Sequence, residues 1–160
     1  MRSGLLLLTV AAMFVAGALG ETCPWLNAAT AAGVLGGAVT DMTVKRAKTA
    51  DDASCTFIRR QGSLVMELRI EVETMTAPAK EFTAYAARCR TATVPLQAIG
   101  NEAVACSDDN APTGRAEQVV GRVRDRAFLV RIGTSDRSAR SEPLGDKARD
   151  VAEQVAGVLF

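Results

Sequence analysis

The chain has 160 residues, with 19 basic residues against 18 acidic ones, four cysteines and no histidine. This balanced charge argues against a nucleic-acid-binding protein, because such proteins need a basic excess to neutralise phosphates. The lack of histidine excludes a histidine-based catalytic triad and a mixed cysteine and histidine zinc site.

Residues 1–20 have the pattern of a cleavable signal peptide. Arg2 supplies a positive charge, an uncharged apolar run follows over Leu5–Leu19, and small residues precede the expected cleavage point after Gly20. The apolar run is shorter than the ~20 residues of a membrane span, so we expect no stable membrane anchor. The pattern predicts an exported protein with one domain over residues 21–160, either secreted or retained in the periplasm or cell envelope.

The first part of this domain predicts a helix and two weak strands. Small side chains recur at helical spacing over residues 23–37, and the segment ends in Gly36-Gly37, which is typical of a helix C-terminus. Shorter patterns predict strands over residues 39–48 and 54–59.

A stronger strand signal covers residues 64–73, where apolar and polar side chains alternate strictly. This period of two predicts one buried face and one solvated face. Glu71 and Glu73 belong to the solvated face, so we expect them beside other charges and outside any pocket. An acid–base pair would instead need a carboxyl group in an apolar pocket.

The middle of the chain predicts a second helix and two short strands. The helix covers residues 76–90, with Thr76 as its N-cap. Strands follow over residues 94–98 and 102–107, and residues 107–114 read as a plain loop. This loop lacks the spacing and the closing glutamate of an EF-hand, so no metal site is expected.

The last part predicts a β-hairpin over residues 116–134 and a final helix that starts near Pro143. In the expected register Gly121 lies opposite Phe128, which leaves room for the aromatic ring. Hairpin-linked strands with only three helices predict an α+β domain, in which the helices pack on a single antiparallel sheet.

The four cysteines have no C-x-x-C spacing, and their even number in an exported chain predicts two disulfides. We expect Cys23–Cys55 and Cys89–Cys106, which would each close a short loop and tie a helix to the sheet. The two other pairings would close longer loops and leave the first helix and the later strands untied locally.

Several short motifs together resemble a known class of proteins. They are Cys23–Asn27, Cys55–Phe57, Ala98–Ala103 and the hairpin Val119–Ile132, followed by a last helix rich in alanine and valine. The chain resembles small exported α+β domains of unknown function, many of them lipoproteins, found mainly in actinobacteria. It is also similar in layout to extracellular sensor domains of bacterial Ser/Thr kinases. This chain departs from those lipoproteins because Glu21 and Thr22 replace the small residues of a lipid-attachment site. The resemblance implies no catalytic residues.

A local excess of positive charge suggests a binding face. Residues 115–140 contain seven arginines and three acidic residues. The candidate interface residues are Arg122, Arg124 and Arg131, beside the apolar Val120 and Leu129 on the outer face of the hairpin. Trp25 is a further candidate anchor, or else a cap over the first helix. Alternatively, the arginines pair with the carboxylates of the strand over residues 64–73, which is the commoner arrangement on solvated sheet faces.

These observations predict a non-catalytic exported domain that binds a protein partner or a small ligand in the cell envelope or outside the cell. No cofactor, metal or nucleic acid is implied. The alternatives are a secreted enzyme that uses a carboxylate or serine site, and an inhibitor or structural envelope protein that acts through its surface.

Overall fold

The computed structural model describes residues 22–47, 52–111 and 114–160, so the predicted signal peptide lies outside the described residues. Within them, three helices and seven strands follow one another. The elements are α1 (Ala28–Leu35), β1 (Asp41–Arg46), β2 (Ala53–Gln61), β3 (Leu64–Thr74), α2 (Pro78–Ala86), β4 (Val94–Leu96), β5 (Glu102–Ala111), β6 (Gly114–Val123), β7 (Arg126–Thr134) and α3 (Ser141–Leu159).

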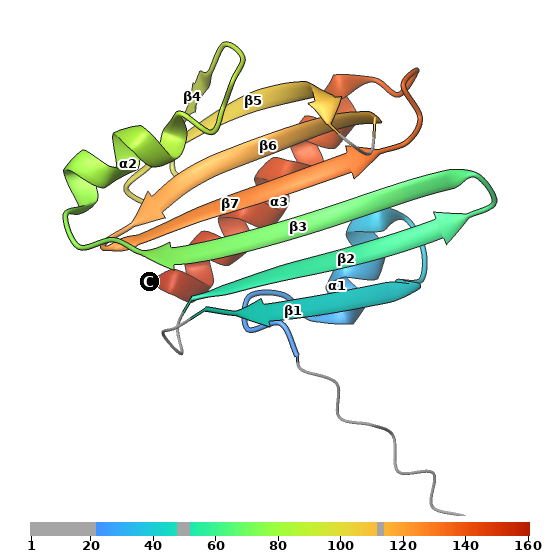
Figure 1. Cartoon of the computed structure of the whole chain (residues 1–160), viewed down its shortest axis with the longest axis horizontal. Coiled ribbons are helices and arrows are strands. Elements are labelled where there is room, and N and C mark those ends of the chain that lie inside the picture. The colour runs from blue at the N-terminus through green and yellow to red at the C-terminus, as the bar shows by residue number, and fades with distance from the viewer. Residues whose placement is uncertain (1–21, 48–51, 112–113) are drawn as a thin grey trace, which may run out of the picture.

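All seven strands belong to one sheet in the order β1-β2-β3-β7-β6-β5-β4. Every neighbouring pair is antiparallel (Figure 1). The pairing of β3 with β7 joins the meander β1–β3 to the later strands, although α2, β4, β5 and β6 separate these two strands in sequence. The predicted α+β domain with one antiparallel sheet, three helices and two disulfides is confirmed.

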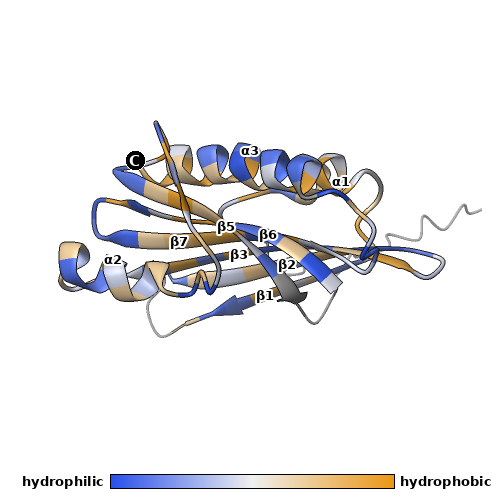
Figure 2. Ribbon diagram, turned by 90° about the horizontal axis from the view of Figure 1, so that it is seen from above, coloured by the Kyte–Doolittle hydropathy of each residue, from blue (hydrophilic) through white to orange (hydrophobic). Residues whose placement is uncertain are grey.

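The main core lies on the face of the sheet that α1 and α3 cover, here called the α3 face (Figure 2). Phe57 and Phe128 from the strands are fully buried there, as are Leu35 of α1 and Val151 of α3. The apolar stripe predicted for the last helix is confirmed, since it points at the sheet. Gly121 pairs with Phe128 as expected, and a Cβ atom at Gly121 would overlap the Phe128 ring.

A smaller core lies on the opposite face, here called the α2 face, where α2 covers one end of β6 and β7 (Figure 2). Phe82 of α2 and Met75 pack there against Val120 and Leu129, which are buried. The expectation that Val120 and Leu129 form part of an exposed interface is therefore wrong. A helix with its own apolar stripe packs on them, and strand periodicity alone gave no sign of that contact.

Two details of the predicted elements also need correction. Thr76 does not cap α2: the N-cap is Ala77, and the Glu81 carboxylate accepts hydrogen bonds from the backbone N–H groups of both residues instead. The residues after 107 do not form a plain loop either, because β5 continues to Ala111. Its polar sequence lacks an apolar alternation, but β6 supplies backbone partners along this edge, with a register shift between Asp108 and Ala111.

Both predicted disulfides are present. Cys23–Cys55 ties the segment before α1 to β2, and Cys89–Cys106 ties the segment after α2 to β5. This pairing of the cysteines agrees with the fold, because each disulfide joins a segment next to a helix to a strand of the sheet. No helix in the described part of the chain combines the length and the apolar character that crossing a membrane requires.

Candidate functional site

The strand register aligns a row of polar residues across the α2 face, beyond the area that α2 covers. Arg69 on β3 lies directly opposite Arg131 on β7, and Arg131 lies opposite Gln118 on β6. Gln118 in turn lies opposite Cys106 on β5. Like charges directly opposite one another on a sheet destabilise it, so the facing arginines need neighbouring anions.

A hollow of about 430 Å³ opens over this row and is called the arginine hollow below. Its walls come from β3, β5, β6, β7 and the segment that follows α2. The lining residues are Arg69, Glu71, Arg88, Arg90, Ser107, Asp108, Gln118, Leu129 and Arg131. Four arginines thus face two carboxylates, which gives the lining an excess of positive charge.

Glu71 is the carboxylate that holds two of these arginines together. Its side chain is only 9% exposed, with one oxygen 2.5 Å from Arg69 Nε and the other 2.6 Å from Arg88 Nη2. The prediction that Glu71 lies beside other charges is confirmed, but the prediction that it belongs to a solvated face is wrong, because its side chain is buried. The segment after α2 contacts β6 and β5, and the Arg88 side chain reaches from there to the Glu71 carboxylate on β3.

Arg88 is fixed from two further sides. Its guanidinium lies 4.9 Å from the centre of the Tyr85 ring, and Nη1 lies 4.0 Å from a Glu73 oxygen. Partial burial disfavours the charged form of Arg88, but the hydrogen bond to Glu71 and the neighbouring negative groups outweigh burial and raise its pKa. Burial also raises the pKa of Tyr85, so this phenol stays protonated. Arg88 is therefore a permanent cation in a fixed position.

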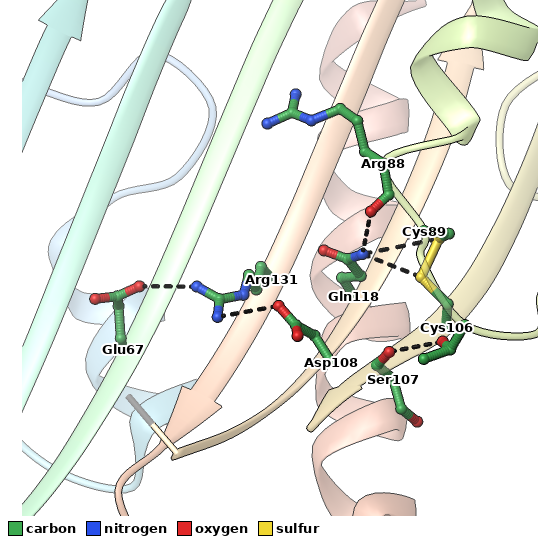
Figure 3. A network of polar contacts seen from close by, with 9 residues as sticks. Glu67, Arg88, Cys89, Cys106, Ser107, Asp108, Gln118 and Arg131 are labelled. Carbon is green, nitrogen blue, oxygen red and sulfur yellow. Dashed lines mark hydrogen bonds and ion pairs between the residues drawn. A yellow bond between two sulfur atoms is a disulfide. The ribbon is translucent and has the colours of Figure 1, made fainter. Parts of the chain in front are cut away.

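Arg131 lies at the other side of the hollow between two more carboxylates (Figure 3). Its Nη1 is 3.6 Å from Glu67 Oε1 and its Nη2 is 3.6 Å from Asp108 Oδ2, and the side chain is only 13% exposed. The strand positions between these carboxylates hold the small residues Gly133 and Ala116, which leave the space that the arginine spans.

The Cys89–Cys106 disulfide lies next to Gln118, which lines the hollow (Figure 3). The Gln118 amide lies against it, with Nε2 3.1 Å from Cys106 Sγ and 3.4 Å from the backbone oxygen of Arg88. Because Cys89 sits between Arg88 and Arg90 in the chain, the bridge holds both arginines next to the sheet. The exposed Arg90 forms no ion pair with any described residue.

The residues proposed from the sequence as an interface do not form one surface. Arg131 lies in the arginine hollow, whereas Arg122 pairs with Glu102 at 2.7 Å. Arg124 occupies the hairpin turn with a positive φ of 54°. Trp25 lies on the α3 face, where it packs against the main core and Arg126 stacks over its ring at 5.7 Å.

Sequence reasoning missed most of the hollow, including Arg69, Arg88, Arg90 and Gln118. Arg69 and Arg131 both stand at outward positions of strongly patterned strands, so a known β3–β7 register would have aligned them. The positions of Arg88 and Arg90 carry no local signal, because they depend on the disulfide. Among the described residues, no group of three or more His, Cys, Asp or Glu side chains is placed to hold a metal ion.

No protein-family profile, curated protein or solved structure matches this chain.

Proposed function

We propose that this chain is an exported, non-catalytic binding domain that takes up an anionic ligand in the arginine hollow. The observation that carries this proposal is the facing pair Arg69 and Arg131, with Arg88 and Arg90 beside it. Glu71, Glu67 and Asp108 offset the repulsion between these arginines in the free protein, and an anion between the guanidinium groups would offset it further.

The internal carboxylates support binding because they position the arginines without using all their donors. Each guanidinium has five N–H groups in a planar fork that matches a carboxylate or phosphate. Glu71 engages one nitrogen of Arg69 and one of Arg88, which leaves other donors of both side chains for a ligand. Arg90 adds a cation without a described ion-pair partner.

The same contacts argue for binding rather than catalysis. A general acid at neutral pH needs a carboxyl group whose surroundings favour the protonated form, such as an apolar pocket. Glu71 instead touches two guanidinium groups, and Asp108 lies 3.6 Å from Arg131. Both carboxylates are thus placed to hold arginines.

Export is supported by the signal-peptide pattern and by the two disulfides, which form and persist in oxidising compartments. Expression in a bacterial host with secretion, followed by an intact-mass measurement, tests this part. We expect the mass of residues 21–160 with both bridges formed. A mass that retains residues 1–20, or a diacylglycerol on Cys23, would contradict it.

Binding is tested by titrating the domain with phosphate and citrate while recording ¹H–¹⁵N spectra. We expect shifts at Arg69, Gln118 and Arg131, and an affinity about three- to tenfold weaker for Arg69→Gln and for Arg90→Gln. Arg122→Gln is the matched control, since it removes an arginine that is paired outside the hollow. Shifts centred on the hairpin turn or on Trp25, or no saturable binding of either anion, would overturn the proposal.

A further inference from the structure

A second hollow of about 260 Å³ adjoins the arginine hollow on the same face of the sheet. Its lining includes Lys45 of β1, Ser54 of β2, and Arg69 and Glu71 of β3. Arg69 and Glu71 line both hollows, so the two depressions meet on β3. Together they form a track, here called the cross-strand track, that runs from β7 to the sheet edge at β1.

Positive charges lie at both ends of this track, with Glu71 and Glu73 between them. Lys45 pairs with Ser54, and Ser54 pairs with Glu71, next to the row that holds Arg69 and Arg131. Neighbouring strands are roughly 4.8 Å apart, so β7 and β1 are separated by roughly 14 Å, three strand spacings. Lys45 is exposed and forms no ion pair with any described residue. A single small anion at Arg69 and Arg131 would leave this distant cation unused.

The lining also indicates which kind of extended anion fits. The residues that line both hollows include no aromatic side chain on which nucleic-acid bases or sugar rings could stack. An extended peptide advances about 3.3–3.6 Å per residue, so four or five residues cover the length of the track. The Ser54 hydroxyl offers a polar group for its backbone.

We infer that the ligand is an acidic segment of a partner protein, bound in extended conformation along the cross-strand track. One carboxylate contacts the guanidinium groups of Arg69 and Arg131, and another contacts Lys45 at the sheet edge. This inference rests on the proposed function, because it names the class of anion that the arginine hollow receives. It goes further in requiring a ligand that is long enough to reach β1.

The test is fluorescence anisotropy with labelled, end-capped peptides of two and six glutamates, and with a hexaglutamine control. We expect hexaglutamate to bind at least tenfold more tightly than diglutamate, and hexaglutamine not to bind. Lys45→Gln should weaken hexaglutamate binding about three- to tenfold and leave diglutamate binding unchanged. The matched control is Lys80→Gln, which removes an exposed lysine of α2 that lines neither hollow.

Equal affinities for the two glutamate peptides, or no effect of Lys45→Gln, would overturn the inference and leave the proposed function standing. Tighter binding of inorganic polyphosphate or of an oligonucleotide of equal charge would also overturn it, because the partner would then not be a peptide. Failure of both glutamate peptides while phosphate still binds would again remove only the inference. Failure of every anion would remove the proposed function as well.

Discussion

Replacing Glu71 with glutamine removes a carboxylate that the protein itself supplies to the arginine hollow. The substitution keeps the shape of the side chain but takes away the charge that faces Arg69 and Arg88. Stability and binding should respond in opposite directions. The two guanidinium groups would repel each other more strongly in the free protein, and they would attract an external anion more strongly.

The size of the stability loss follows from the exposure of the partners. Hydrogen bonds to charged groups contribute about 1.5–3 kcal/mol each when they are shielded from water. The Arg69 and Arg88 side chains are 46% and 37% exposed, so solvent screens both pairs substantially. We therefore expect Glu71→Gln to lower the free energy of unfolding by about 1–2 kcal/mol, which is a fall of about 3–8 °C in Tm for a domain of this size.

Urea unfolding followed by the fluorescence of Trp25 measures this loss, because the ring packs on the α3 face, away from the site. Hexaglutamate affinity, measured on the same variant, should rise about fivefold, since one more positive charge near the ligand contributes about 1 kcal/mol. Glu73→Gln is the matched control: its side chain is 56% exposed and lies 4.0 Å from Arg88, so stability should change by less than about 0.5 kcal/mol.

Equal stability of the Glu71→Gln and Glu73→Gln variants would refute the claim that Glu71 bridges the arginines. A weaker affinity of Glu71→Gln for hexaglutamate would refute the claim that its carboxylate occupies donors of the binding site.

Three further predictions follow from the fold. Gly121→Ala should destabilise the domain by about 1–3 kcal/mol in urea unfolding, because the added methyl overlaps the buried Phe128 ring. Gly33→Ala, whose methyl enters open space on α1, should be neutral or slightly stabilising. Equal effects of the two substitutions would refute the close packing of Gly121 against Phe128. Removing either disulfide by paired Cys→Ser substitution should cost about 3–4 kcal/mol, somewhat more for the bridge with a sequence separation of 32 than for that of 17, and unchanged urea midpoints would contradict this. Hydrogen bonds from the side chain and backbone of Ser138 lower the pKa of Asp136. The stability that ionised Asp136 contributes is therefore present above the unfolded carboxyl pKa of about 3.9, and it is lost as the pH falls through the lower folded pKa. An NMR titration should show a higher pKa of Asp136 in Ser138→Ala, and an unchanged pKa would contradict the role of these hydrogen bonds.

Local patterns were informative wherever one face of an element is buried against a single neighbour. The strict alternation over residues 64–73 matches β3, and the alanine and valine stripe near the C-terminus matches α3. The Gly121 and Phe128 pairing was also predictable, because a short hairpin fixes its own register. The two disulfides could be inferred because they close shorter loops than either alternative pairing, with sequence separations of 32 and 17.

The candidate site was largely beyond these patterns. For Arg131, singled out for its local charge, the alternative that it pairs with a carboxylate of residues 64–73 is confirmed by its contact with Glu67, but its second partner, Asp108, comes from β5 and had no signal in the sequence. The Arg122 and Arg124 positions, chosen by the same argument, belong to the other end of the hairpin. Charge counting along the chain could not separate these positions, because it carries no information about which strands are neighbours.

The sequence by itself determined the class of fold, the pairing of the cysteines and the apolar face of each principal element. These features depend on composition and on contacts between segments that are close in the chain. Only the tertiary structure decided that α2 packs on the face opposite α3 and that β3 pairs with β7. Those two choices bury Val120 and Leu129, place Arg69 opposite Arg131, and bring Arg88 to Glu71. The physical reason is that a polar side chain on a strand is solvated or buried according to what lies across the sheet from it, and a strand's own sequence does not specify its neighbour.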